Sequence, residues 1–92
     1  MKIKDFGVRA DGQRMFYFYC PGCKYGHAYE VPRWTWNGSM DKPSFIPSLL
    51  IYEHPPSPRC HLFVTDGMIH FCSDCGHALA GKTVELPDPD LE

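Results

Sequence analysis

The sequence predicts a small, mainly β fold in one domain, with little helix. Gly and Pro divide the chain into pieces of strand length, and one piece, residues 14–19 (RMFYFY), is an almost continuous aromatic run. Asp66-Gly67 also separates two apolar runs that can pair as a hairpin. Since 92 residues hold a single hydrophobic core, residues 1–92 are expected to form one domain.

The extended segments follow one another along the chain. Residues 14–19 suit a strand covered on both faces, and Asn37-Gly38 is a strong reversal signal further on. Residues 54–59 contain three prolines, cannot join a strand ladder, and are expected to form a stiff exposed loop. The other candidate strands are residues 29–31, 33–36, 48–52 and 83–86.

Residues 60–72 (CHLFVTDGMIHFC) give the clearest supersecondary signal. A two-residue type I′ turn at Asp66-Gly67 would pair Thr65 with Met68, and successive pairs would follow outward. One face would then be apolar and belong to the core, with Leu62, Val64, Ile69 and Phe71 on it. Further on, residues 77–79 are expected to form one helical turn ending at Gly81, and residues 87–92 a frayed acidic tail.

Composition excludes several classes of protein. The net charge is −2 and the nine Lys and Arg residues are scattered, so nucleic-acid binding is not expected. No apolar run is long enough to span a bilayer, and no apolar signal segment follows the charged start, so a cytoplasmic location is expected. In that reducing compartment the five cysteines favour metal binding over disulfides.

Two C-x-x-C pairs predict a zinc site of the zinc-ribbon kind. Cys20-Pro21-Gly22-Cys23 and Cys72-Ser73-Asp74-Cys75 each place two thiols at one tight turn. A redox pair is disfavoured because no βαβ pattern surrounds the first of them. Spacing alone gives Cys72 as the fourth ligand, whereas the hairpin register places Cys60, not Cys72, on the face of Cys75; a bulge in the turn would exchange these two.

The chain also resembles a known family through three motifs taken together: C-P-G-C, C-H-x-F-V-x-D-G and D-C-x-H-A-L-A-G. The family consists of small phage and prophage proteins of unknown function. Its members often carry the name ammonia monooxygenase, and relatives lie near bacterial ubiquitin-like conjugation genes. The resemblance covers about residues 16–87. The monooxygenase name has little physical support, because such an enzyme is a copper-dependent membrane complex.

The resemblance implies roles for particular residues. It carries over to Cys20, Cys23, His27, Cys60, His61, Asp74, Cys75 and His77. It departs at Lys24 and at Cys72, where the family has an apolar residue. The resemblance therefore favours Zn²⁺ bound by Cys20, Cys23, Cys60 and Cys75 in a closed structural site.

The histidines raise the question of catalysis. His61 and Asp74 fall on the same outer hairpin face, and His27 and His77 each follow a knuckle, so all four are candidate acid–base or metal-binding residues. They could equally support the thiolates, or one histidine could replace a cysteine ligand. His54 and His70 are expected to be ordinary surface residues. Aromatic residues in the middle of the chain could form a recognition surface or simply pack in the core: Trp34, Trp36, Phe45 and Pro47.

Two functions follow from these observations. The favoured one is a zinc-binding accessory protein of phage type that acts through protein contacts, and the sequence leaves open whether it is also an enzyme, with a non-enzymatic role favoured. The alternative is a small zinc-dependent peptidase or amidase using His61, Asp74 and His77, with water on an open metal site. A shell of four thiolates would disfavour the second. The sequence gives neither the partner nor the oligomeric state.

Overall fold

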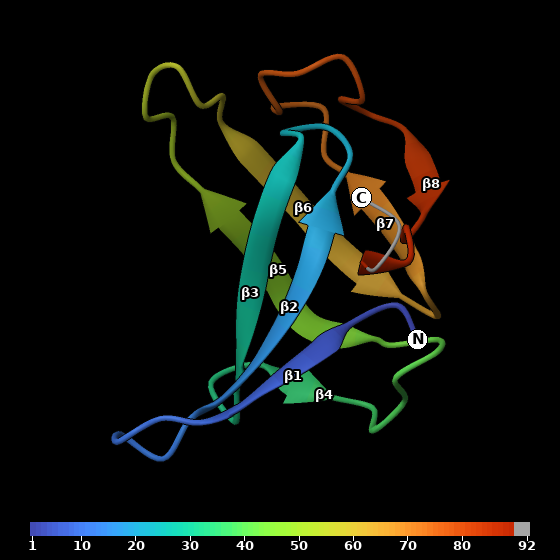
Figure 1. Cartoon of the computed structure of the whole chain (residues 1–92). Helices are drawn as coiled ribbons and strands as arrows, with labels where there is room; N and C mark the ends of the chain where they lie inside the picture. Colours follow the sequence, from blue (N-terminus) through green and yellow to red (C-terminus); the bar gives the residue numbers. More distant parts are fainter. Residues whose placement is uncertain (90–92) are drawn as a thin grey trace.

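The protein folds as two antiparallel β-sheets packed face to face (Figure 1). The computed structural model describes residues 1–89. The three-stranded sheet contains β1 (Lys4–Val8), β2 (Arg14–Cys20) and β3 (Tyr25–Val31). The five-stranded sheet contains, in chain order, β4 (Thr35–Trp36), β5 (Phe45–Ile51), β6 (Cys60–Thr65), β7 (Met68–Phe71) and β8 (Thr83–Glu85). The predicted small, mainly β fold is confirmed, and no α-helix occurs in residues 1–89.

The hairpin of β6 and β7 has the predicted register. Thr65 pairs with Met68 and Leu62 with Phe71, so the connecting loop is Asp66-Gly67. Both loop residues have positive φ, 49° at Asp66 and 77° at Gly67, as a type I′ turn requires. The Asp66 N–H also donates to Ser44 Oγ at 2.8 Å, which ties the turn to the segment before β5.

Aromatic side chains join the two sheets. Tyr29 on β3 stacks on Phe45 on β5 with ring centroids 4.1 Å apart, and Phe16 packs against Trp36 at 4.4 Å. The predicted core face of the hairpin is buried, as are Phe16 and Phe18 on β2. Phe45 therefore belongs to the core, Trp34 and Trp36 pack at its edge, and Pro47 is exposed. Because the sheets share these side chains, neither has a hydrophobic interior of its own.

Several predicted boundaries need correction. The strands predicted at residues 29–31, 33–36 and 48–52 are Tyr25–Val31, Thr35–Trp36 and Phe45–Ile51. The sequence did not indicate β1, because KDFGV alternates poorly and contains a glycine. The helical turn expected at residues 77–79 is replaced by two hydrogen-bonded turns, in which Ala80 N–H donates to His77 O and Lys82 N–H donates to Leu79 O. Of the predicted tail, Pro89 is buried, and residues 90–92 lie outside the described part.

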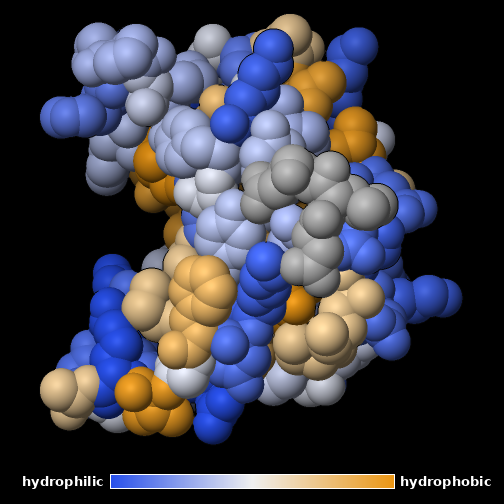
Figure 2. All heavy atoms as spheres, in the orientation of Figure 1, coloured by the Kyte–Doolittle hydropathy of each residue, from blue (hydrophilic) through white to orange (hydrophobic). Residues whose placement is uncertain are grey.

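The face drawn in Figure 2 is largely hydrophilic, and apolar side chains are also exposed on it, some of them over the β1–β2 hairpin. Phe6 and Val8 on β1 are 63 % and 60 % exposed, and Phe6 stacks on Tyr17. In residues 1–89 no helix is long and apolar enough to cross a membrane.

Candidate active site and metal centre

Strand β6 separates two clusters of reactive side chains. Successive residues of a strand point to opposite faces of the sheet. Cys60 therefore points inward, where it is fully buried, while His61 points to the outer face and is partly exposed. The inner cluster consists of thiols and imidazoles, and the outer cluster contains a serine, a histidine and a carboxylate.

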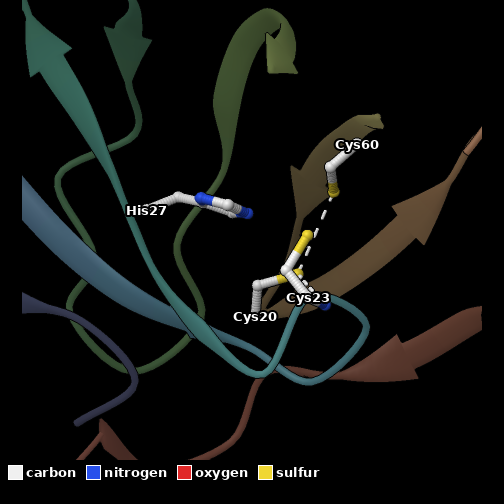
Figure 3. Close-up of side chains that lie close together, drawn as sticks. All are labelled: Cys20, Cys23, His27 and Cys60. Atoms are coloured by element: carbon white, nitrogen blue, oxygen red, sulfur yellow. Dashed lines mark hydrogen bonds between the residues drawn. The ribbon is translucent and has the colours of Figure 1, made fainter. Parts of the chain in front are cut away.

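The inner cluster gathers donors from three strands (Figure 3). Cys20 at the end of β2 and Cys60 at the start of β6 have sulfur atoms 4.0 Å apart. With Cys23 and His27 they form a group whose ligand atoms all lie within 4.8 Å of one another. We call these four residues the sulfur cluster.

The C-P-G-C sequence forms the turn between β2 and β3. Lys24 N–H donates to Cys20 O at 2.8 Å, and Cys23 N–H donates to Cys20 Sγ at 3.4 Å. Gly22 is needed for a close approach, because a Cβ there would lie 2.2 Å from Cε1 of His77. The turn therefore holds two sulfur atoms together and also accommodates the imidazole of His77.

The thiols of the sulfur cluster do not share one protonation state. The hydrogen bond from Cys60 lowers the pKa of Cys20 to about 4. The same contact, together with burial, raises the pKa of Cys60. Burial and the negative charge of Cys20 raise the pKa of Cys23 to about 11. Without a cation the buried cluster thus carries one stabilised thiolate, because further negative charge there is unfavourable.

The donor set fits a thiophilic metal ion. His27 is 7 % exposed, and its Nε2 is buried without a hydrogen-bond partner in the described part of the chain. A buried imidazole nitrogen left unpaired among three thiols is costly unless it binds something, and a metal ion would satisfy it. Thiolate and imidazole ligands suit Zn²⁺ and similar ions rather than calcium or magnesium. The cluster is therefore compatible with a metal ion.

Of the four predicted ligands, Cys20, Cys23 and Cys60 come together in the sulfur cluster, whereas Cys75 belongs to a neighbouring group. Cys75 and His77 lie with Cys60 in a set whose ligand atoms are within 4.8 Å. His77 Nε2 is 3.5 Å from Cys60 Sγ, and Cys75 Sγ accepts the His61 N–H at 3.3 Å. Cys60 is thus shared by both groups.

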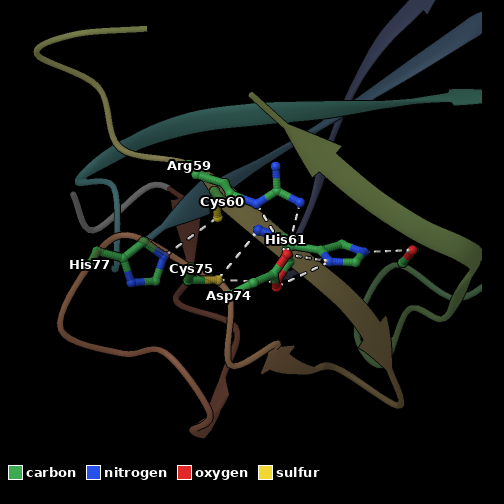
Figure 4. Close-up of polar contacts among 7 residues, drawn as sticks. Arg59, Cys60, His61, Asp74, Cys75 and His77 are labelled. Carbon is green, nitrogen blue, oxygen red and sulfur yellow. Dashed lines mark hydrogen bonds and ion pairs between the residues drawn. The ribbon is translucent and has the colours of Figure 1, made fainter. Parts of the chain in front are cut away.

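The outer cluster is a hydrogen-bonded series of three side chains (Figure 4). Nδ1 of His61 lies 3.2 Å from Oδ1 and 3.3 Å from Oδ2 of Asp74. Nε2 of the same ring lies 3.1 Å from Ser48 Oγ. An Nδ1–H directed at the carboxylate leaves Nε2 free to accept the serine proton. This is the arrangement of a Ser–His–Asp triad.

Arg59 fixes the carboxylate of the triad. Its Nε and one terminal nitrogen donate to Asp74 Oδ2 at 3.0 and 2.8 Å. These bonds, followed by the one to His61, lower the pKa of Asp74, so the group is an anion at neutral pH. Both partners are about two-fifths exposed, so the pair orients the carboxylate more than it stabilises the fold.

Ser48 occupies an irregular part of β5. The ladder with β6 is regular from Leu49 to Ile51 and shifts register between Phe45 and Leu49. Such a bulge redirects side chains and is common beside active sites. Trp34 Nε1–H donates to Ser48 O at 3.2 Å, which holds the backbone there. Ser48 is exposed, so its hydroxyl is open to a substrate.

The predicted meeting of three histidines with Asp74 is therefore wrong in part. The structure brings His61 and Asp74 together, but His27 and His77 lie at the sulfur groups on the inner side of β6. Cys72 lies near His61 and Asp74 and not near Cys20, as the hairpin register indicated. Sequence analysis missed Ser48, because a serine in an apolar strand has no local signature. Ser48 could have been found only from the pairing of β5 with β6, which the sequence did not predict.

Fold and site together define the class: a small, mostly β protein with a metal-compatible Cys/His cluster beside an exposed Ser–His–Asp arrangement. A family model described as bacterial ubiquitination-like system serine protease (BubE) matches residues 2–72. The chain belongs to this family. The matched range includes Ser48 and His61 and ends just before Asp74. The family description agrees with the expected link to ubiquitin-like conjugation genes. It supports neither the expected phage origin nor the expected zinc. Comparisons with curated proteins and with solved structures find no match.

Proposed function

We propose that the protein is a serine protease of a bacterial ubiquitination-like system, with Ser48 as nucleophile, His61 as general base and Asp74 as the group that orients His61. The observation that carries the proposal is the hydrogen-bonded series from Ser48 Oγ through both nitrogens of His61 to Asp74. These contacts lie within or just beyond the usual range for a free triad, which tightens when substrate binds. The family description supports the same chemistry.

The chemistry assigns one task to each side chain. Ser48 Oγ attacks the substrate carbonyl while its proton moves to His61 Nε2. The imidazolium then gives that proton to the leaving nitrogen, the C–N bond breaks, and an acyl-Ser48 ester remains. Water, deprotonated by His61, releases the acid and restores the serine. Asp74 stays ionised and stabilises the imidazolium that forms twice in this cycle.

A structural Zn²⁺ in the sulfur cluster forms the second part of the proposal. Cys20, Cys23 and Cys60 would hold it, and the unpaired Nε2 supports His27 as the fourth ligand in place of the predicted Cys75. A closed shell of this kind supplies folding free energy and leaves no place for substrate. The ion would then fix the inner end of β6, and with it the position of His61.

Placing the chemistry on Ser48 replaces both earlier hypotheses. A zinc hydrolase using His61, Asp74 and His77 needs the two histidines at one metal, but they lie in different groups on the two sides of β6. The hypothesis of a purely structural accessory protein does not account for the hydrogen bond between Ser48 and His61. Partners are expected to be proteins of the ubiquitination-like system, and the five free thiols agree with the proposed cytoplasmic location.

Covalent labelling tests the proposal directly. A fluorophosphonate reacts with an activated serine and with few other hydroxyls, because the reaction needs the adjacent base. We expect one adduct per chain, located at Ser48 by peptide mass spectrometry. Ser48→Ala and His61→Ala should abolish the adduct. Ser57→Ala, in the loop before β6, is the matched control and should label normally.

Two outcomes would contradict the triad. One is unchanged labelling of Ser48→Ala, which would place the reactive serine elsewhere. The other is a complete lack of labelling in folded, metal-loaded protein whose melting temperature is normal. Metal content must be measured on the same samples, since loss of the sulfur cluster would disturb the triad through β6.

A further inference from the structure

We infer that a groove beside Ser48 binds an apolar side chain on the acyl side of the bond that is cleaved, which would make the enzyme selective for an apolar residue before that bond. The inference rests on the proposed function, because it assigns a substrate to the same serine. The groove has a volume of about 190 Å³ and is lined by Phe45, Ile46, Pro47, Ser48, Phe63 and Thr65.

The groove lies on the same face as the triad. Outward-facing residues of β6 are His61, Phe63 and Thr65, because their neighbours Leu62 and Val64 are buried. Ile46 is 67 % exposed and Phe63 39 % exposed, so apolar surface lies next to the reactive hydroxyl. Exposed apolar surface that adjoins an active site commonly serves binding.

Strand register sets the side of Ser48 on which the groove lies. His61 pairs with Leu50, and Phe45 pairs with Val64, so the strand positions run from His61 past Ser48 toward Ile46 and Thr65. The leaving group must lie toward His61 Nε2, which protonates it. The groove lies on the far side of Ser48 from His61 and therefore faces the acyl part of the substrate.

The size and chemistry of the groove set the kind of side chain. Sites for drug-sized ligands have volumes of about 300 to 1,000 Å³, so this smaller groove suits one side chain. Its lining is apolar apart from the hydroxyls of Ser48 and Thr65 and contains no charged residue. A charged side chain would lose hydration there without gaining a partner. An aliphatic or aromatic side chain would bury apolar area against Phe63 and Ile46.

A series of esters measures this preference. The probes are p-nitrophenyl acetate, butyrate and hexanoate, which share a leaving group and differ in acyl length; each rate is divided by that of hydroxide-catalysed hydrolysis. Burying a methylene group is expected to raise kcat/KM about fourfold, so acetate and butyrate, which differ by two methylene groups, should differ about fifteenfold. Phe63→Ala and Ile46→Ala should flatten this dependence. Phe6→Ala, which removes an exposed ring from β1, should keep it.

The outcomes separate this inference from the proposed function. A steep dependence on acyl length that Phe63→Ala removes supports the groove as the acyl site. Hydrolysis that depends on Ser48 but is insensitive to acyl length, or sensitive in the same way in Phe63→Ala, overturns the groove and leaves the protease intact. Hydrolysis that Ser48→Ala does not reduce, or that is absent, overturns both.

Discussion

The two sides of β6 use neighbouring residues for opposite purposes. Cys60 is fully buried and lies 4.0 Å from the sulfur of Cys20, a residue far away in the sequence. His61, the next residue, lies on the outer face with one nitrogen toward Asp74 and the other toward Ser48. The inner side ties the two sheets together, and the outer side presents groups that can react.

This difference shows how a small domain can hold a polar site in a fixed geometry. A chain of 92 residues has a small hydrophobic core and therefore little packing with which to hold polar side chains in one arrangement. A metal ion bound at one end of a strand would fix the backbone there without using much of the core. The adjacent outward residue is then positioned by the same backbone, and no additional packing is required.

Removal of the proposed metal ion should have the largest effect, because it should disturb the inner and outer sides of β6 together. Metal binding at structural zinc sites contributes on the order of 10 kcal/mol, whereas the free energy of unfolding of a whole domain is about 5 to 15 kcal/mol. We expect a strong chelator, or Cys60→Ser, to abolish the cooperative thermal transition and the labelling of Ser48 together. Circular dichroism and metal analysis of the same sample measure this. A metal-free protein that still melts cooperatively would contradict the structural role.

Asp74→Asn should impair catalysis on the outer side of β6 without affecting the sulfur cluster on the inner side. The amide cannot hold His61 Nδ1–H as a carboxylate does, and the comparable change in other triads lowers kcat by about 10⁴. We expect a decrease of about 10³ to 10⁴ in ester turnover, with zinc content and melting temperature close to those of the parent. Asp41→Asn is the control, since Asp41 is exposed and its carboxylate pairs with the N-terminal amine, away from His61 and Ser48 in the sequence. Loss of zinc in Asp74→Asn would show that the two sides are not independent.

Local patterns predicted the parts of the fold that depend on few residues. The Asp66-Gly67 turn fixed the hairpin register, and the register correctly separated Cys60 from Cys72 and placed His61 near Asp74. The C-P-G-C turn likewise brought Cys20 and Cys23 together. Each of these features is decided by turn geometry and by the alternation of a strand.

Contacts between distant strands were not accessible in this way. Ser48 reaches His61 because β5 pairs with β6 and bulges beside it, and neither fact is encoded in residues 48–52 alone. The sequence makes His27 on β3 a catalytic candidate, but in the folded chain it lies with Cys20, Cys23 and Cys60, and this depends on contacts between distant strands. Strand β1 was missed because its pairing with β2, rather than its composition, makes it a strand.

Two substitutions should decide whether His27 or Cys75 is the fourth ligand of the proposed metal ion. Loss of an outer hydrogen-bonding partner lowers metal affinity by about 10- to 100-fold. If His27 is a ligand, His27→Ala should lower zinc affinity by more than that, while Cys75→Ser, which loses a sulfur hydrogen-bonded to the His61 backbone, should lower it less. Competition with a chromogenic chelator gives both affinities, and His54→Ala in the exposed loop is the histidine control. The opposite order would restore the predicted set with Cys75.

Arg59→Gln should give the smallest effect, confined to the outer side. The guanidinium holds Asp74 through two hydrogen bonds, but both side chains are about two-fifths exposed, so solvent and salt screen the pair. Exposed ion pairs contribute little, so turnover should fall only about a few-fold as Asp74 loses its fixed orientation. Arg9→Gln removes a guanidinium that also pairs with acidic residues but lies in the loop between β1 and β2, so it should leave turnover unchanged. Steady-state ester hydrolysis at low and high salt measures both, and the difference between Arg59→Gln and the parent should shrink as salt rises. A loss as large as that of Asp74→Asn would instead make Arg59 part of the reacting group and not a support for it.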